Sequence, residues 1–309
     1  MTEHELISMS PGWIRAGEVG AQALAAGQAA CVPGARAADV AIAMEDFIRS
    51  AGLEPAFPGT VSIDSMAAHW SPTRTDDCII EEGQLVKLDC GASHLGDLSD
   101  NAITIEVGGT NQHADLIRAS EACLAAAIDA VRPGLNLGDL GAIVEATAED
   151  HGFQTIENLG GHSLERNKLH AALYVPSVGM KTKQVLKAGD RLAIEPFVTD
   201  GRAGRVQDAG PSNVYHLRRL RPQRAPAPKR LQSYLQRTHP HLAFSSRWLE
   251  GAMPPAQLSF ALSQLQRTNV VTHYTALREA SGGMVAQREA TVMVSDDGGY
   301  VTTKLPVAA

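Results

Sequence analysis

Apolar and polar positions recur along the chain with two different periods, which separate helices from strands. A helical period with abundant alanine runs through residues 12–30 and again through residues 111–131. Strand-like segments follow these stretches, at residues 84–107, 171–178, 191–198 and 285–293. This mixture of elements predicts an α+β protein.

The chain also contains an internal repeat at an offset of one hundred residues. The segment VPGARAADVAIAMEDFIRSAGL at 32–53 matches RPGLNLGDLGAIVEATAEDHGF at 132–153 at its Pro-Gly pair and at an Asp, a Glu and a later Gly. Each copy follows a helix, and each predicts a turn, a second helix ending near Gly and then a strand. The period is too long for a solenoid, so we expect two similar halves with a cleft between them.

Composition predicts a globular protein without an export or membrane segment. The chain has 309 residues and is 44% hydrophobic, which is enough to bury a core. Its first residues lack a basic region followed by an apolar run, and no later stretch has the length of a membrane span. The four cysteines are widely spaced, with no C-x-x-C pair. We therefore expect a soluble, cytoplasmic monomer.

Charge is distributed unevenly around a net value of −7. Residues 201–275 contain eleven Lys or Arg residues, Arg247 among them, against only Asp208 and Glu250. The same segment carries the helical runs KRLQSYLQRT and PPAQLSFALSQLQRTN. Two interpretations stay open: a solvated basic surface that balances the acidic remainder, or a face that docks on nucleic acid.

Candidate chemistry begins with two aspartates in the strand-like segment 84–107. If this hairpin folds about a midpoint between His94 and Leu95, Asp89 lies directly across from Asp100. Two carboxylates in that position repel each other unless a divalent cation lies between them. The alternative is that both are solvated on an exposed edge, because a register shift of one residue would separate them.

Three further residues extend this pair into a possible metal site. Glu195 lies in the apolar segment RLAIEPFV, which predicts a continuous buried strand, and Glu289 lies on the alternating face of GMVAQREATVMV. His162 precedes His170 in NLGGHSLERNKLH. A set of four carboxylates and one imidazole suits two hard or borderline divalent ions. Taken singly, each glutamate fits the solvated face of a strand equally well.

These residues and their neighbours resemble the methionine aminopeptidases of peptidase family M24, in particular the type II enzymes of archaeal kind. The resemblance covers nearly the whole chain and rests on PAFPGTVSIDSMAAHW, VKLDCGASHLGDLSDNAITIEV, NLGGHSLERNKLHAALYVP, AIEPFVTDGRAGRV and LREASGGMVAQREATVMV. It implies the pita-bread fold, with one catalytic domain at 1–309 and an inserted helical subdomain at 206–275.

The resemblance also implies a role for each candidate residue. Asp89 would chelate one metal ion, Asp100 and Glu289 would bridge two, and His162 and Glu195 would hold the second. His69 and His170 would contact the substrate amine and the scissile carbonyl, and Glu195 would also move a proton. Phe57, Leu169 and Tyr274 would line an apolar pocket for the methionine side chain. The ions would be two of Co, Mn, Fe or Zn.

The implied activity is removal of the initiator methionine from nascent proteins whose second residue is small and uncharged, and the basic insertion could dock on the ribosome. Two departures concern the surroundings of the site: Ala290-Thr291 stands where the family usually has His-Thr, and GTVS precedes Ile63 where Asn-Leu-Ser is more familiar. The alternatives are an Xaa-Pro peptidase, which shares the five ligands, and a metal-free binding protein with the same fold.

Overall fold

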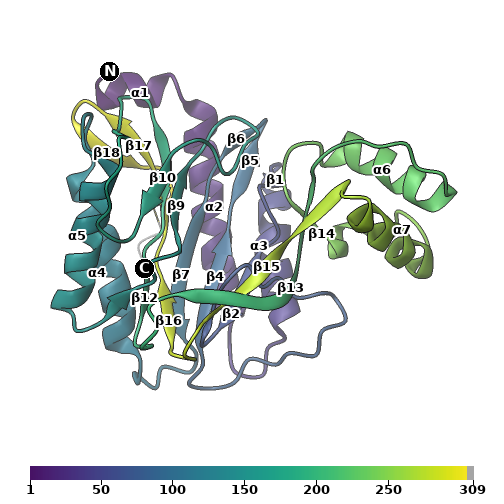
Figure 1. The fold of residues 1–309 in the computed structure, drawn as a ribbon, viewed down its shortest axis with the longest axis horizontal. Helices are drawn as coiled ribbons and strands as arrows, with labels where there is room; N and C mark the ends of the chain where they lie inside the picture. Colours follow the sequence, from purple (N-terminus) through teal and green to yellow (C-terminus); the bar gives the residue numbers. More distant parts are fainter. Residues whose placement is uncertain (305–309) are drawn as a thin grey trace.

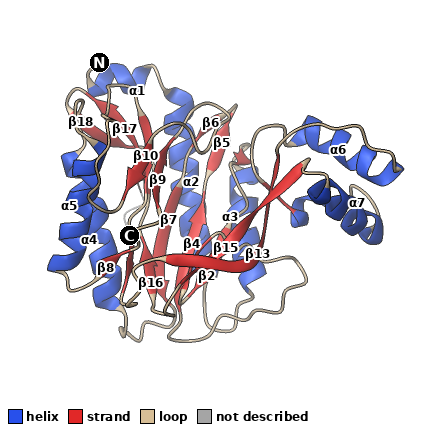
Figure 2. Cartoon of the chain, viewed as in Figure 1, coloured by secondary structure: helices blue, strands red, loops and turns tan. Residues whose placement is uncertain are grey.

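A computed structural model describes residues 1–304, so residues 305–309 of the expected 1–309 domain lie outside the described part. Helices cover the sheets of the main body, and a smaller group of helices projects from it at the right of Figure 1. Figure 2 shows the same view with strands in red between the helices. None of the helices within residues 1–304 is long and apolar enough to cross a membrane.

The first half places two long helices against an antiparallel sheet. Its elements are α1 (Glu3–Ser8), α2 (Pro11–Ala30), α3 (Ala37–Ser50), β1 (Glu54–Pro55), β2 (Thr60–Ile63), β4 (Leu85–Cys90), β5 (Ala92–His94), β6 (Asp97–Leu98) and β7 (Asn101–Glu106). The sheet has the order β2-β4-β7. Buried aliphatic side chains from α2, α3 and these strands form one hydrophobic core.

The second half repeats this arrangement around a core of its own. Its elements are α4 (Ala114–Ala130), α5 (Leu137–Asp150), β8 (Gln154–Thr155), β9 (Gly160–Ser163), β10 (Tyr174–Pro176), β11 (Arg191–Ile194), β12 (Phe197–Thr199), β16 (Val285–Gln287), β17 (Ala290–Ser295) and β18 (Gly298–Val301). The strands form a sheet of order β10-β9-β11-β17-β18 and a smaller one of order β16-β12-β8.

The predicted repeat is confirmed down to single hydrogen bonds. Gly34 and Gly134 have φ of 87° and 88°, the left-handed region that glycine enters without strain. The Gly34 N–H donates to the Ile80 carbonyl and the Gly134 N–H to the Leu186 carbonyl, each at 2.8 Å. The Pro-Gly pairs are therefore turns that bond to the same point of each half, the connection that precedes β4 in the first half and β11 in the second.

A third group of elements carries the projecting helices. It consists of β3 (Met66–Ala68), β13 (Val206–Leu217), α6 (Pro226–Thr238), β14 (Phe244–Ser245), a 3₁₀ helix (Ser246–Leu249), α7 (Pro255–Arg267) and β15 (Val271–Glu279). Its sheet has the order β14-β13-β15-β3, so β3 joins the group to the first half. We call residues 218–270 the lobe; its helices pack around a separate apolar core.

The two halves meet along a seam with one backbone bridge at its centre. Ala102 of β7 and Glu289 exchange backbone hydrogen bonds of 3.4 and 3.0 Å. On either side of this bridge, a threonine hydroxyl takes the place of the next pair of backbone hydrogen bonds. The Thr104 Oγ1 bonds to both backbone groups of Gln287 at 2.7 Å, and the Thr291 Oγ1 bonds to both backbone groups of Asp100 at 2.7 and 2.8 Å. The seam thus orders the backbone next to two of the candidate ligands.

The hairpin register differs from the sequence prediction by two residues. Asp89 pairs with Ala102 rather than with Asp100. The turn is centred on Leu95 and Gly96, both with positive φ, as a two-residue type I′ hairpin requires. Because a shift of two preserves the alternation of faces, Asp89 and Asp100 still share one side of the hairpin as diagonal neighbours.

Candidate metal centre

All ten candidate residues from the sequence line one cavity of about 220 Å³ between the two halves and the lobe. The candidate ligands at its floor are Asp89, Asp100, His162, Glu195 and Glu289. The other five candidates are Phe57, His69, Leu169, His170 and Tyr274. Residues separated by more than two hundred positions in the chain therefore meet at one site.

Three of the carboxylates lie where strands are interrupted. Asp100 precedes β7, Glu195 separates β11 from β12, and Glu289 separates β16 from β17. The continuous strand expected through Glu195 is therefore wrong. Pro196 follows it and has no N–H to donate to a sheet ladder, which explains the break. All three carboxylates line the cavity from these interruptions.

His162 lies among these carboxylates. It is on β9, opposite Ala193 of β11. Its Nε2 is 3.5 Å from Asp100 Oδ2 and 3.8 Å from Glu195 Oε1. One donor atom each from Asp100, His162 and Glu289 lies within 4.8 Å of the others, and all three side chains are buried. The three residues could hold a single cation.

The electrostatics of the cavity disfavour bare negative charge. Burial raises the pKa of Asp89 to about 7, and burial with the neighbouring acidic groups raises the pKa of Asp100 and of Glu289 well above its usual range. The pKa of Glu195 is raised in the same way, by burial and then by Asp89. Four carboxyl groups crowded out of water therefore require protons or a counter-cation.

The residues present fit divalent metal ions. Among the described residues, Asp89 Oδ1 and Glu289 Oε2 are buried oxygens without a hydrogen-bond partner. A buried acceptor left unpaired costs roughly 1–3 kcal/mol, so this arrangement is unfavourable unless something binds there. Oxygen donors with one imidazole are ligands for Mn, Fe, Co or Zn rather than for a soft thiophilic ion.

His69 is held in an unusual backbone conformation at the cavity wall. Its φ is +68°, which costs a side-chain-bearing residue energy. The Nδ1 lies 3.1 Å from the carbonyl oxygen of Thr275 on β15, so Nδ1 carries the proton and Nε2 is left as an acceptor. Burial lowers the pKa of His69, which keeps the ring neutral.

His170 lies between the candidate ligands and Tyr274. Its ring centre is 4.2 Å from that of His162 and 6.0 Å from that of Tyr274. Desolvation in the cavity, and then His69, lower the pKa of His170, whose side chain remains partly exposed, and burial with His170 lowers the pKa of His162 to about 3. Both rings are therefore neutral near pH 7, the form in which imidazole binds metals or donates one hydrogen bond.

The remaining wall of the cavity is apolar and includes residues that sequence reasoning did not find. Phe57, Leu169 and Tyr274 line this part of the cavity. Val214 of β13 and Ala243, next to β14, complete the wall from the side of the lobe. No motif singles out a valine or an alanine, so only the folded chain places them there.

Gln287 is a polar neighbour of the site that could have been found from the sequence. Its Nε2 lies 3.4 Å from Glu195 Oε2, and its side chain is buried. It precedes Glu289 by two residues, the spacing that puts two side chains on the same face of an extended chain. The amide donor orients one of the candidate ligands.

Comparison with known proteins agrees with this geometry. Residues 13–216 match the model of metallopeptidase family M24. A methionine aminopeptidase from Thermococcus onnurineus is 39% identical over 291 residues, covering 94% of this chain and 98% of its own.

Solved structures show the same fold. A methionine aminopeptidase from Thermotoga maritima superposes with a TM-score of 0.70 at 24% identity and 98% coverage of both chains. A thermophilic Arx1 superposes with a TM-score of 0.83 at 18% identity, covering 100% of this chain and 93% of its own. The predicted pita-bread fold is confirmed, and the chain belongs to metallopeptidase family M24.

Proposed function

We propose that the protein is a methionine aminopeptidase of type II that removes the initiator methionine from nascent proteins with a small, uncharged second residue. The observation that carries this proposal is the meeting of the five candidate ligands, two neutral histidines and an apolar wall in one cavity. The identity of the relatives supports the same activity.

The candidate ligands would hold two divalent ions, from Co, Mn, Fe or Zn. Asp89 would bind one ion, Asp100 and Glu289 would bridge both, and His162 and Glu195 would bind the other. Such ions supply an acidified water near neutral pH and a Lewis acid for the peptide carbonyl. Glu195, whose pKa is raised by burial, is placed to accept and return a proton at its carboxylate.

The two histidines would orient the substrate. His69 offers its free Nε2 as an acceptor for an N–H of the substrate, because its Nδ1 is engaged by Thr275. His170, neutral near pH 7, donates one hydrogen bond to the oxygen that gains charge as the peptide bond is attacked.

The apolar wall would select the side chain at the N-terminus. Phe57, Leu169, Tyr274, Val214 and Ala243 lie on it, and an unbranched thioether fills such a surface without needing a hydrogen bond. The small volume leaves room for one side chain and favours a chain end over an internal segment.

Peptide hydrolysis tests the proposal directly. Metal-stripped protein is titrated with Mn²⁺ or Co²⁺ and assayed for methionine release from Met-Ala-Ser, with Gly-Pro as the matched control. We expect release from Met-Ala-Ser that rises with metal occupancy and saturates at two equivalents. Preferential cleavage of Gly-Pro would establish the Xaa-Pro alternative instead. No turnover of either peptide by metal-loaded protein would refute the peptidase.

We further infer a partner for the lobe in the cytoplasm, the ribosome. Lys229, Arg230 and Arg237 of α6 line a groove of about 630 Å³ beside α7, which suits phosphate groups. We expect co-sedimentation with ribosomes that weakens with salt and weakens further when these three residues become Gln. The matched control is Arg118→Gln with Arg132→Gln, two exposed arginines of the main body. Equal co-sedimentation of all three proteins would refute the docking surface.

A further inference from the structure

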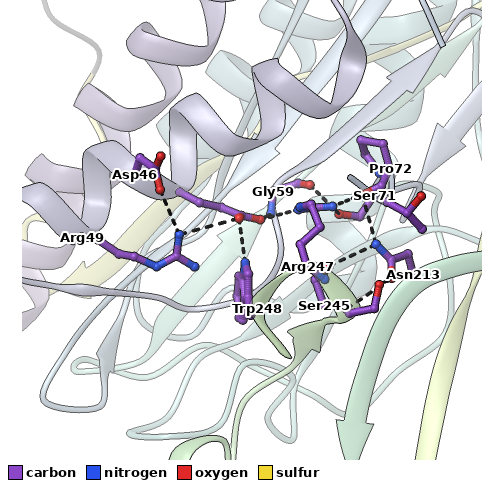
Figure 3. A network of polar contacts seen from close by, with 12 residues as sticks. Asp46, Arg49, Gly59, Ser71, Pro72, Asn213, Ser245, Arg247 and Trp248 are labelled. Carbon is purple, nitrogen blue, oxygen red and sulfur yellow. Dashed lines mark hydrogen bonds and ion pairs between the residues drawn. The ribbon is translucent and has the colours of Figure 1, made fainter. Parts of the chain in front are cut away.

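A buried ion pair outside the metal centre joins the lobe to the first half. Glu45 of α3 and Arg247 of the 3₁₀ helix bond to each other, and their side chains are 3% and 1% exposed. Sequence analysis counted Arg247 with the basic surface of the lobe, and that assignment is wrong. The pair lies within the network of polar contacts in Figure 3.

Each partner of the pair also binds the chain next to the cavity. Glu45 Oε1 accepts the N–H of Gly59 at 3.1 Å, and Oε2 accepts the indole N–H of Trp248 at 2.6 Å. Arg247 donates from Nη1 to Ser71 Oγ at 3.0 Å and to the Pro72 carbonyl. The Ser71 hydroxyl in turn donates to the Gly59 carbonyl at 2.7 Å. The pair therefore holds both Gly59 and Ser71–Pro72.

Each of these two anchor points lies next to a residue of the cavity wall. Phe57 lies two residues before Gly59, and His69 lies two residues before Ser71. The positive φ of His69 is a conformation that its surroundings must enforce. We call residues 57–72 the wall segment.

The equivalent glutamate of the second half shows which contacts of Glu45 are particular to the first half. Glu145 occupies the position equivalent to Glu45, and its carboxylate accepts the N–H of Gly179 at 2.8 Å in the same way. Glu145 is only half-buried, and its hydrogen bond is exposed. The bond from glutamate to a glycine N–H is thus common to both halves, whereas the arginine and the indole reach Glu45 from the lobe.

A role in stability alone does not explain such a pair. The desolvation of two buried charges offsets much of their attraction, and apolar residues of similar volume often serve folding as well or better. Charge and hydrogen bonds provide a defined geometry, because one planar guanidinium donates to the carboxylate, Ser71 and Pro72 at once.

We propose that Glu45 and Arg247 are positioning residues that lock the wall segment against the lobe and thereby place His69 and Phe57 for substrate. The lobe is then part of the substrate site through this contact as well as through Ala243. The pair touches no metal ligand, so its loss changes how peptide is held while leaving metal binding intact. Only the kinetic part of the test depends on the proposed function.

The test compares variants at this contact with a matched control. Arg247→Met removes the pair, Arg247→Lys keeps the charge without the planar fork, and Glu45→Met with Arg247→Met replaces the pair by apolar contacts. The control is Arg74→Met, which removes the exposed Arg74–Glu250 ion pair that also joins the first half to the lobe. Metal binding by calorimetry, thermal unfolding, amide hydrogen exchange and kinetics with Met-Ala-Ser are measured for each.

We expect kcat/KM to fall by about tenfold or more in Arg247→Met and in the double variant, since a displacement of 1 Å at a site can cost about a hundredfold. Arg247→Lys recovers part of the loss, and Arg74→Met changes kcat/KM by less than about twofold. Metal affinity stays at the parental value. Exchange of amides 57–72 becomes faster in Arg247→Met but not in the control.

The outcomes separate this proposal from the proposed function. The double variant covers the case in which Arg247→Met fails to fold. If it unfolds at the parental temperature and retains full kcat/KM and slow exchange at 57–72, the positioning role is refuted. If the parent protein does not cleave Met-Ala-Ser, the exchange data decide alone: faster exchange confined to 57–72 supports the lock, and unchanged exchange overturns it.

Discussion

The position of each carboxyl group in the cavity favours cation binding but lowers the stability of the metal-free protein. Asp100 is 4% exposed, and its pKa is raised well above the usual range by burial and by Asp89 and Glu195. A group that is costly to keep charged in the empty cavity becomes favourable when a cation is bound. Function and stability should therefore respond in opposite directions to its replacement.

Asp100→Asn tests this opposition. We expect the variant to bind Mn²⁺ or Co²⁺ at least tenfold more weakly, yet to exceed the metal-free parent in free energy of unfolding by about 1–2 kcal/mol at pH 8, because an uncompensated charge is removed. Urea unfolding in the presence of a chelator measures the second effect. The control is Asp129→Asn on the exposed side of α4, and a destabilised Asp100→Asn would contradict the expectation.

Proton release on metal binding follows from the same groups. The pKa of Asp89, raised to about 7, lies above its ordinary value, so the metal-free carboxyl holds a proton below pH 7 and must lose it to bind a cation. Metal affinity should therefore rise as pH increases from about 6 to 8. Calorimetry in two buffers of different ionisation enthalpy measures the released protons, and heats independent of buffer would contradict the argument.

At the scale of elements, two threonine hydroxyls take the place of backbone hydrogen bonds between strands of the two halves. Thr104 of β7 and Thr291 of β17 each bond to both the N–H and the carbonyl of the residue opposite. A hydroxyl can do so because it is donor and acceptor at once. The departure noted at Ala290-Thr291 therefore leaves the hydroxyl of the seam in place.

Thr104→Val keeps the shape and removes the hydroxyl. We expect a loss of about 2–3 kcal/mol in the free energy of unfolding, since the N–H and the carbonyl of Gln287 lose a partner in a buried place. Thr268→Val is the control, because its hydroxyl bonds only to carbonyls at the end of its own helix α7. Equal stability changes in denaturant titrations would show that the seam does not depend on the hydroxyl.

The lobe contains a histidine that links its packing to pH. His239 lies against Phe244 and Trp248, and burial followed by Arg49 lowers its pKa to about 4 from an ordinary 6.5. Between pH 6.5 and 4 the unfolded chain takes up a proton here that the native chain does not. Stability from this residue is therefore lost as pH falls through that window.

His239→Phe should remove this loss of stability at acidic pH. We expect the difference in thermal midpoint between variant and parent to be more positive at pH 5 than at pH 8, because only the parent carries a group that protonates on unfolding. Differential scanning calorimetry at both values measures it. His151→Phe, an exposed histidine after α5, is the control, and a difference that does not change with pH would rule out His239 as the cause.

For the whole molecule, the candidate metal centre would also join the two halves. Asp89 and Asp100 come from the first half, and His162, Glu195 and Glu289 from the second. A ligand that binds only the assembled site stabilises the native state in proportion to the logarithm of its concentration. Both halves then gain stability together.

Metal titration followed by thermal unfolding tests this coupling. We expect one transition whose midpoint rises with Mn²⁺ or Co²⁺ concentration and falls on chelation. Tryptophan fluorescence, to which Trp13 in the first half contributes, and far-UV circular dichroism should report the same midpoint. Two separate transitions, of which only one responds to metal, would show that the halves are not fastened by the site.

Much of the whole-molecule arrangement could be predicted from the sequence, but two of its features could not. Periodicity and the repeat predicted the paired halves, the hairpin and strand patterns indicated the five candidate ligands, and the resemblance assigned a role to each. The hairpin register was missed because Leu95 adopts a positive φ that a leucine seldom takes, while Gly96 carried the turn signal. Burial of Arg247 could not be read from local charge, since its partner Glu45 lies about two hundred positions earlier.

The backbone of His69 restricts how this protein can change over evolutionary time. Few residues accept a φ of +68°, and those that do so cheaply, glycine and asparagine, lack an imidazole. A saturation library at this position selected for folding alone should enrich glycine and asparagine, whereas selection for turnover should return histidine. Mutations that stabilise the backbone at this position are thus expected to remove the proposed activity, so selection for stability and selection for turnover would favour different residues here.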